Sequence, residues 1–195
     1  MIIGGLDECG TGACAGPIIS VMAVFNEEDK ERLPRGVKDS KKTSRNQRNM
    51  LYDQLLNLAV DVGVGWAWPW EIDQGFNAAL QLSYERAVHG VNPKFTPDYI
   101  IVDGINKVQS WSGKQVVEPK ADNNHWQVSA ASIIGKVFRD RLMVEVGNKF
   151  PEYGFSTHFG YCTQSHLDSI KNSGRLIDPF DRARYIHRGT YRTGT

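Results

Sequence analysis

The alternation of hydrophobic and polar positions predicts strands at the start of the chain and a mixture of strands and helices after residue 40. Five apolar segments have the pattern of strands: Ile2 to Leu6, Ile18 to Phe25, Val60 to Trp68, Tyr99 to Val102 and Gln115 to Glu118. Three segments have apolar residues at helical spacing: one capped by Thr43 or Ser44, one that includes Ile72 to Ala87, and one from Val128 to Val146. The last is apolar nearly all round, so we expect it to be buried. This order of elements predicts an α/β domain with a mixed sheet.

Length and composition indicate an ordinary globular chain. Its 195 residues, 41% hydrophobic and 23% charged, can form one substantial core, and no repeat or long linker divides them. The longest apolar runs are far shorter than the roughly 20 residues of a membrane span, and the first residues lack the features of a targeting peptide. Three cysteines, an odd number, favour reduced thiols. We therefore expect a single cytoplasmic domain, monomeric and without membrane contacts.

Positive charge is concentrated in two segments, although the formal net charge is only +1. Six Lys and Arg side chains lie between Arg35 and Arg48, and six more lie from Lys171 onward. The rest of the chain is therefore acidic. The near-cancellation excludes a uniformly basic nucleic-acid binder. Basic segments beside an acidic body remain compatible with a polyanionic ligand, and also with solvated surface charge.

The glycine-rich stretch from Gly10 to Pro17 does not match the common nucleotide-binding loops. A P-loop requires Lys and then Ser or Thr after its last glycine, whereas Gly16 is followed by Pro17 and Ile18. A dinucleotide-binding loop opens a helix, whereas this stretch leads into a predicted strand. Only the backbone N–H groups of the loop itself are left to contact a ligand.

Four carboxylates follow or flank the predicted strands. Asp7 and Glu8 come after the first strand, Asp103 comes after Tyr99 to Val102, and Asp122 precedes the buried helix. Strand ends of an open α/β sheet can converge on one ligand, and buried adjacent carboxylates are costly unless they are paired or metal-bound. The set is suited to Mg²⁺ or Mn²⁺. Beside basic segments it suggests two-metal hydrolysis of a phosphodiester.

Several soft or aromatic side chains have two interpretations. Structural zinc would use four candidate ligands: Cys9, Cys14, His158 and Cys162. The alternative for Cys14 is small-residue packing within the loop. The remaining histidines, His125, His166 and His187, form no ligand pattern and are expected at the surface or in the core. Tyr161, which follows a glycine, could stack on a base or sugar, or could fill part of the core.

Taken in order, the motifs of this chain resemble those of ribonuclease HII, the type 2 ribonuclease H family. The matching segments cover nearly the whole chain: Gly5 to Gly12, Ala15 to Pro17, Asp39 to Lys42, Val102 to Gly104, Lys120 to Asp122, Ser129 to Asp140, and Tyr153 to Tyr161. No single segment is decisive, but the ordered set is highly specific.

The resemblance implies a ribonuclease H-like mixed sheet, in which three antiparallel strands are extended by parallel strands and flanked by helices. It also implies a small helical C-terminal part, over about residues 150–195, that extends the substrate-binding surface. The implied activity is endonucleolytic cleavage of the RNA strand of RNA–DNA hybrids, and cleavage 5′ of ribonucleotides embedded in duplex DNA. The products would carry 3′-hydroxyl and 5′-phosphate ends, and the cofactors would be two Mg²⁺ or Mn²⁺ ions with no organic group.

The resemblance also implies roles for individual residues. The metal-binding catalytic carboxylates would be Asp7, Glu8, Asp103 and Asp122. The loop that reads the ribose 2′-hydroxyl would be Gly10, Thr11 and Gly12. Tyr161 matches the tyrosine that senses the sugar at the RNA–DNA junction, and Lys41 and Lys42 are candidate substrate contacts.

Three positions depart from the family pattern. Thr11 stands where Arg is usual between the loop glycines, and Phe159 stands where Lys is usual before Gly-Tyr, so two positive charges near the substrate are lost. Gly135 stands where Ala is usual, at a cost of up to about 1 kcal/mol in a helix interior. Two alternatives therefore stay open: a ribonuclease H-fold nuclease with weakened junction specificity, and a non-catalytic module that binds hybrids.

Overall fold

The computed structural model describes residues 1–37 and 43–189. Its strands are β1 (Ile2–Cys9), β2 (Ile18–Asn26), β3 (Asp61–Ala67), β4 (Tyr99–Asp103) and β5 (Lys114–Glu118). Its α-helices are α1 (Arg45–Leu58), α2 (Pro69–Ile72), α3 (Phe76–His89), α4 (Trp126–Lys149), α5 (Phe155–His158) and α6 (Gln164–Ser173). The 3-10 helices are η1 (Glu27–Arg32), η3 (Pro93–Phe95), η4 (Ala121–Asn123), η5 (Pro151–Tyr153) and η6 (Arg182–Arg184). Lys41 and Lys42 lie outside the described residues, so their role stays a prediction.

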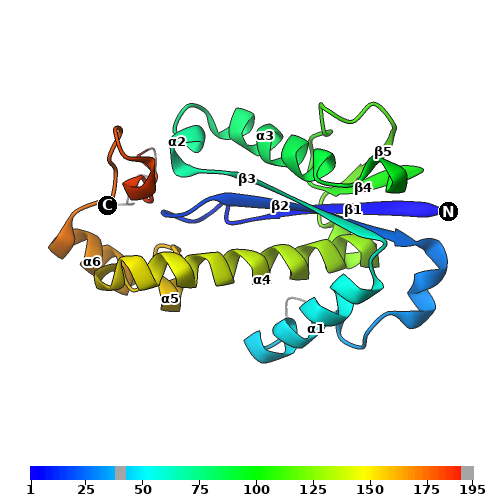
Figure 1. Ribbon diagram of the computed structural model, residues 1–195, viewed down its shortest axis with the longest axis horizontal. Coiled ribbons are helices and arrows are strands. Elements are labelled where there is room, and N and C mark those ends of the chain that lie inside the picture. The colour runs from blue at the N-terminus through cyan, green and yellow to red at the C-terminus, as the bar shows by residue number, and fades with distance from the viewer. Residues whose placement is uncertain (38–42, 190–195) are drawn as a thin grey trace. The chain divides into compact units, whose positions relative to one another are not determined.

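The strands form one five-stranded sheet in the order β3-β2-β1-β4-β5, with β1 at its centre (Figure 1). β2 pairs antiparallel with β1, whereas β4 pairs parallel with β1 and β5 pairs parallel with β4. The predicted mixed sheet is therefore confirmed. Because β1 and β4 are parallel, their C-terminal ends lie at the same edge of the sheet, which is the usual place for a ligand in an α/β fold.

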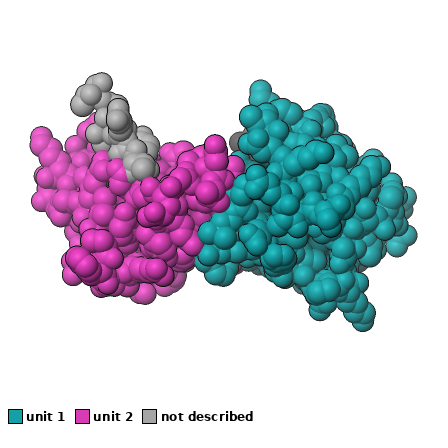
Figure 2. All heavy atoms as spheres, turned by 90° about the horizontal axis from the view of Figure 1, so that it is seen from above, with its two compact units in different colours: residues 1–9, 19–66, 81–137 teal, residues 10–18, 67–80, 138–195 magenta. Residues whose placement is uncertain are grey.

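The chain folds into two compact units that interleave along the sequence (Figure 2). Unit 1 contains residues 1–9, 19–66 and 81–137, and unit 2 contains residues 10–18, 67–80 and 138–195. Unit 1 includes most of the sheet, and unit 2 includes the glycine-rich loop, α2, α5 and α6. A single domain with an extension from about residue 150 stays a prediction. Within the described part of the chain, no helix has the length and hydropathy needed to cross a membrane.

In unit 1, helices cover both faces of the sheet, with α3 on one face and α1 and the first half of α4 on the other (Figure 1). The contact with α4 is close because β1 carries a glycine there. A Cβ atom at Gly5 would lie 2.3 Å from the backbone carbonyl carbon of Gln127. The sequence of β1 thus places α4 directly against the central strand.

On the other face of the sheet, glycines of β3 likewise allow a helix to pack closely against the strand. A Cβ atom at Gly63 would lie 1.9 Å from the carbonyl oxygen of Ala87, and one at Gly65 would lie 2.0 Å from that of Ser83. The alternating Val and Trp side chains of β3 occupy its more exposed face, and the glycines face α3. Backbone therefore packs against backbone between β3 and α3.

Unit 2 has an apolar core of its own. Met143 and Val146 of α4 pack there with Phe155, Leu176 and Ile186. The partly buried ring of Phe159 packs against the same cluster. The predicted helical C-terminal part is thus anchored by apolar side chains as well as by the polar contacts described below.

Candidate functional site

Two of the predicted carboxylates lie at the same level on neighbouring parallel strands. The register of β1 and β4 pairs Leu6 with Val102. The next residues are Asp7 on β1 and Asp103, the last residue of β4. Adjacent strands are about 4.8 Å apart, so the sheet brings these two residues together as the sequence predicted.

β1 continues to Cys9, so Asp7 and Glu8 lie within the strand. The prediction that they follow its end is wrong. Successive side chains of a strand point to opposite faces. Asp7 accordingly accepts a hydrogen bond from Ser132 of α4, and Glu8 accepts one from Tyr84 of α3. The two carboxylates are held by helices on opposite faces of the sheet.

The environment of Asp7 strongly favours its protonated form. Burial raises the pKa of Asp7 to about 8, and the negative charges of Glu8 and Asp103 add to the shift. The hydrogen bond from Ser132 and one from the backbone N–H of Glu8, 2.8 Å long, act in the opposite direction. None of the described groups that shift the pKa of Asp7 is cationic.

The side chain of Tyr84 holds the carboxylate of Glu8. The Tyr84 hydroxyl donates to Glu8 Oε2 over 2.7 Å. Burial raises the pKa of Glu8, and so does the charge of Asp103. Burial also raises the pKa of the Tyr84 phenol, as does the adjacent Glu8, so Tyr84 remains a hydrogen-bond donor. Nothing in the sequence pattern of α3 distinguished Tyr84 from an ordinary core aromatic.

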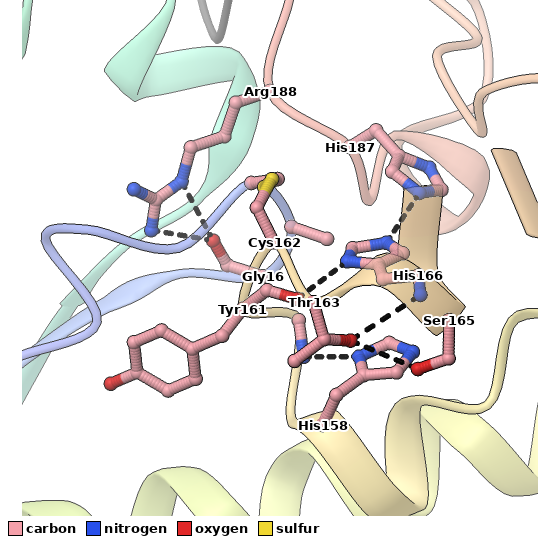
Figure 3. Close-up of a disulfide and its surroundings, with 12 residues drawn as sticks. Gly16, His158, Tyr161, Cys162, Thr163, Ser165, His166, His187 and Arg188 are labelled. Atoms are coloured by element: carbon pink, nitrogen blue, oxygen red, sulfur yellow. Dashed lines mark hydrogen bonds between the residues drawn. A yellow bond between two sulfur atoms is a disulfide. The ribbon is translucent and has the colours of Figure 1, made fainter. Parts of the chain in front are cut away.

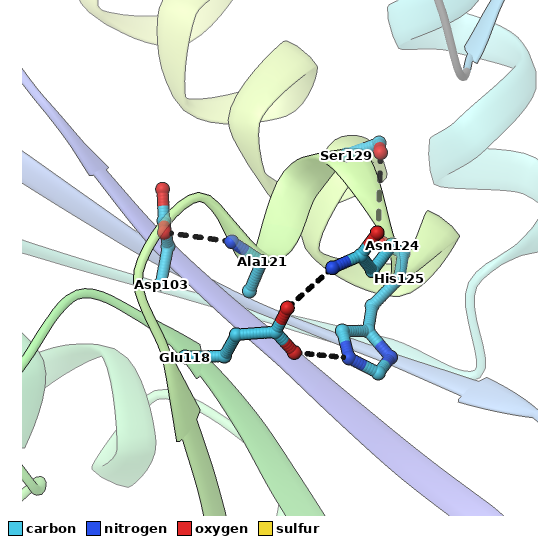
Figure 4. Close-up of polar contacts among 6 residues, drawn as sticks. All are labelled: Asp103, Glu118, Ala121, Asn124, His125 and Ser129. Carbon is cyan, nitrogen blue, oxygen red and sulfur yellow. Dashed lines mark hydrogen bonds and ion pairs between the residues drawn. The ribbon is translucent and has the colours of Figure 1, made fainter.

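The backbone of η4, which contains Asp122, is hydrogen-bonded to the side chain of Asp103. The N–H of Ala121 donates to Asp103 Oδ1 over 2.9 Å (Figure 4), and Asp122 is the next residue, largely buried. The carbonyl of Asp122 accepts a 2.5 Å bond from the Ser129 hydroxyl at the start of α4. The fourth predicted carboxylate is therefore fixed in the segment that contacts the third.

A second polar group lies next to this segment and was not predicted. Glu118, at the end of β5, bonds the ring of His125 over 2.9 Å and also accepts from the side chain of Asn124 (Figure 4). These contacts lower the pKa of Glu118, the histidine contributing most. The pair ties the end of β5 to the turn that precedes α4.

No three of the four predicted carboxylates have ligand atoms within 4.8 Å of one another in the described part of the chain. Among the described residues, the only group of three or more candidate ligands within 4.8 Å of one another is Cys14, Cys162 and His166. The predicted zinc set is thus not assembled, because Cys9 and His158 are absent from the group.

In unit 2, the glycine-rich loop is held from within by two buried arginines. Arg139 of α4 donates to the carbonyl oxygens of Ala15, Pro17 and Phe159 at 2.9–3.0 Å. Arg188 donates to three carbonyls of the loop at 2.6–3.2 Å: those of Gly10, Thr11 and Gly16. Burial lowers the pKa of Arg188 to about 10. Arg188 belongs to the basic segment expected to contact a polyanion, and it is buried instead.

Tyr161 lies against the same loop. Its backbone forms a β-bridge with Ala13, and its ring lies 5.2 Å from the guanidinium carbon of Arg139. The next residue, Cys162, forms a disulfide with Cys14, with Cα atoms 5.7 Å apart (Figure 3). The structure therefore brings Tyr161 and the loop together, and the expectation that all thiols are reduced is wrong for this pair, because the two segments bring the cysteines within bonding distance.

Two histidines next to the disulfide, His166 and His187, form a buried network. The N–H of Leu176 donates to His187 Nδ1, His187 Nε2 lies 3.1 Å from His166 Nε2, and His166 Nδ1 lies 2.9 Å from the carbonyl oxygen of Tyr161 (Figure 3). Since a carbonyl only accepts, His166 carries its proton on Nδ1, and His187 carries its proton on Nε2. Both rings are therefore neutral, as is expected for core histidines.

Comparisons with known proteins establish the family. The model of the family "Ribonuclease HII" matches residues 4–193. The chain belongs to the ribonuclease HII family. A ribonuclease HII of Bacillus cytotoxicus is 38% identical over 175 residues, which cover 89% of this chain and 65% of that relative. This chain thus corresponds to about two thirds of that relative's length.

Solved structures support the ribonuclease H-like fold. Ribonuclease H2 of Pyrococcus horikoshii superposes with a TM-score of 0.81 at 29% identity, over 98% of this chain and 94% of that one. The ribonuclease HII of Archaeoglobus fulgidus, solved in a complex with PCNA, gives 0.77 at 26% identity, over 100% and 98%. Bst-RNase HIII, solved with Mn²⁺, gives 0.73 at 18% identity, over 98% and 67%, which shows the fold alone.

Proposed function

We propose that this protein is an endonuclease of the ribonuclease HII type, which hydrolyses the RNA strand of RNA–DNA hybrids and cuts 5′ of ribonucleotides in duplex DNA. The observation that carries the proposal is the placement of Asp7, Glu8 and Asp103 at the shared edge of β1 and β4, in a chain of this family. The raised pKa values of Asp7 and Glu8 support a site built for cations.

The donor set fits divalent metal ions. Carboxylate oxygens are the ligands preferred by Mg²⁺ and Mn²⁺, and a cation would relieve the repulsion between these charges. Asp7, Glu8, Asp103 and Asp122 would hold the ions. When bound, two such ions supply an activated water and stabilise the leaving 3′ oxygen.

The chain's own residues would orient these groups. Ser132 and the N–H of Ala121 fix the carboxylates of Asp7 and Asp103, so little rearrangement is needed when substrate binds. In unit 2, Gly10, Thr11 and Gly12 would contact the ribose 2′-hydroxyl, and Tyr161 would stack on the sugar. The buried arginines support this role, because their bonds to the loop carbonyls hold the loop in one conformation.

The test of this function is cleavage of a DNA duplex that carries one ribonucleotide, with Mg²⁺ or Mn²⁺ present. We expect a single cut on the 5′ side of the ribonucleotide. Asp103→Asn should lower the rate about 1,000-fold or more, because several kcal/mol of charge stabilisation are lost. Its circular dichroism spectrum and unfolding midpoint should stay close to wild type.

Asp53→Asn is the matched control, since Asp53 is exposed on α1, and it should cut at the wild-type rate. Wild-type protein that binds hybrids but does not cut them, while a reference ribonuclease HII cuts under the same conditions, would support a non-catalytic binding module instead.

A second candidate, altered specificity, is favoured by one observation. Phe159 packs against the core of unit 2, so this position offers no positive charge to substrate, and Thr11 offers none in the loop. Such an enzyme would prefer long hybrids to single embedded ribonucleotides. Measuring the binding and cleavage of both substrates at several salt concentrations distinguishes the two functions, because each lost phosphate contact reduces the salt dependence of binding.

A further inference from the structure

We propose that Tyr84 is a positioning residue for Glu8, which orients that carboxylate for a divalent cation before any cation binds. The inference rests on the proposed function, since it assigns Glu8 to a metal site. It adds a residue on α3 to a site otherwise built from β1, β4 and the segment before α4.

The contact itself is short and enclosed. The Tyr84 hydroxyl lies 2.7 Å from Glu8 Oε2, and Tyr84 is only 3% exposed. A bond from a neutral donor to an ionised carboxylate is stronger than an ordinary hydrogen bond. It occupies one of the roughly four lone-pair positions that an ionised carboxylate offers.

The position of Tyr84 is fixed by its neighbours in the sequence. Ser83, the preceding residue, bonds the hydroxyl of Ser20 over 2.6 Å, and Ser20 is the cross-strand partner of Glu8 on β2. Ser20 and Glu8 therefore project to the same face of the sheet, toward α3. The absence of a side chain at Gly65 lets the backbone of α3 reach this depth, since a Cβ there would lie 2.0 Å from the Ser83 carbonyl oxygen.

This arrangement has a chemical consequence for metal binding. A glutamate side chain has three rotatable bonds, and a cation that binds it must otherwise restrict them at a cost in affinity. Tyr84 restricts them in the folded protein, as the second set of contacts around a metal site commonly does. Loss of the hydroxyl should therefore weaken cation binding without changing the ligand set.

The experiment compares Mn²⁺ binding by wild type, Tyr84→Phe and Tyr99→Phe, measured by isothermal titration calorimetry without substrate. Tyr99→Phe is the matched control, since it removes a hydroxyl from the same unit on β4. We expect Tyr84→Phe to bind Mn²⁺ roughly tenfold more weakly and Tyr99→Phe to bind it as wild type does. The Mg²⁺ concentration for half-maximal cleavage should rise by a similar factor, while the rate at saturating Mg²⁺ falls less.

A merely structural tyrosine would give a different result. Tyr84→Phe would then lower the unfolding midpoint of the metal-free protein but leave Mn²⁺ affinity within twofold of wild type, and this outcome overturns the proposal. Equal weakening in Tyr99→Phe also overturns it. Because Mn²⁺ binding is measured without cleavage, failure of the wild type to cut would contradict the proposed function and leave the role of Tyr84 decided by the titration.

Discussion

A buried guanidinium needs acceptors for its donors, and Arg188 obtains them from the loop it supports. It is 3% exposed and donates to backbone carbonyls of the loop. A fork of fixed donors can satisfy several carbonyls at once, whereas an ammonium group cannot reach the same positions. Arg188 is therefore a structural residue of the loop.

The exchange Arg188→Lys should accordingly be costly. We expect the free energy of unfolding to fall by about 2–4 kcal/mol, because several loop carbonyls lose a charged donor in a buried site. Urea unfolding measures the change. Arg184→Lys, at an exposed position of η6, should change stability by less than about 0.5 kcal/mol. Equal effects of the two variants would contradict the assignment.

For Tyr161, the proposed stacking role can be tested separately from any role of the hydroxyl. Tyr161→Ala should raise KM for a duplex with one ribonucleotide by roughly 10-fold to 100-fold, since stacking on one base or sugar contributes about 1–3 kcal/mol. Tyr161→Phe keeps the ring and should remain within a few fold of wild type. A core role would instead appear as a loss of stability in the alanine variant with KM unchanged.

At the scale of elements, β3 and α3 depend on the absence of side chains. Gly65→Ala should lower the free energy of unfolding by about 1–3 kcal/mol, because the new methyl group would force α3 away from the sheet. Chemical denaturation measures this. Gly135→Ala in α4 is the contrast, since the nearest atom to its Cβ would be a Val21 methyl carbon at 3.3 Å, and it should change stability by less than about 1 kcal/mol. If Gly65→Ala left the free energy of unfolding unchanged, α3 would be able to shift away from the sheet without cost, contrary to this prediction.

The elements themselves were largely predictable, because apolar spacing is a local signal. The buried helix expected over Val128 to Val146 is α4, and Ser44 caps α1 as one of the two expected residues. The predicted end of β1 is too early. Asp7 and Glu8 are polar and break the apolar pattern, but both still pair with residues of β2. For the carboxylates, the place of Asp103 at the end of β4 and the match of all four to a family motif were visible in the sequence.

Other parts of the site could not be read from the sequence. Tyr84 and Ser132 lie on helices whose apolar spacing gives no sign that one hydroxyl faces a carboxylate. Arg188 lies in a basic segment whose composition favours solvent or phosphate contact. Their roles depend on contacts between residues far apart in the chain, which neither periodicity nor charge reports.

At the scale of the whole molecule, the histidine network predicts a loss of stability in acid. Burial lowers the pKa of His166 to about 4 and that of His187 to about 3, while the unfolded chain titrates near 6.5. Between these values the unfolded state binds protons that the folded state does not, so the free energy of unfolding falls as pH falls below about 6.5. The expected slope is about 1.4 kcal/mol per pH unit for each histidine.

Urea unfolding at several pH values between 7.5 and 4.5 tests this. His166→Gln should flatten the slope, whereas His89→Gln, at an exposed position on α3, should keep it. If both variants retain the wild-type slope, the network does not control acid stability.

The disulfide predicts a specific thiol count. Denatured, unreduced protein should react with Ellman's reagent at one thiol, Cys9, and at all three after reduction. Because 148 residues separate Cys14 from Cys162, loss of the bond in Cys14→Ser should lower stability by up to about 5 kcal/mol. Cys9→Ser is the control and should leave the unfolding midpoint nearly unchanged. Three reactive thiols before reduction would contradict the pairing.

The hydrogen bond from Arg188 to the Gly10 carbonyl also affects the order in which parts of the protein fold during synthesis. The two residues are 178 positions apart, and a ribosome adds roughly 5–20 residues per second. The segments of unit 1 are complete once residue 137 has left the exit tunnel, whereas the loop after β1 must wait for residue 188. A nascent chain arrested before that point should hold its carboxylates in a folded sheet while its glycine loop is still sensitive to protease.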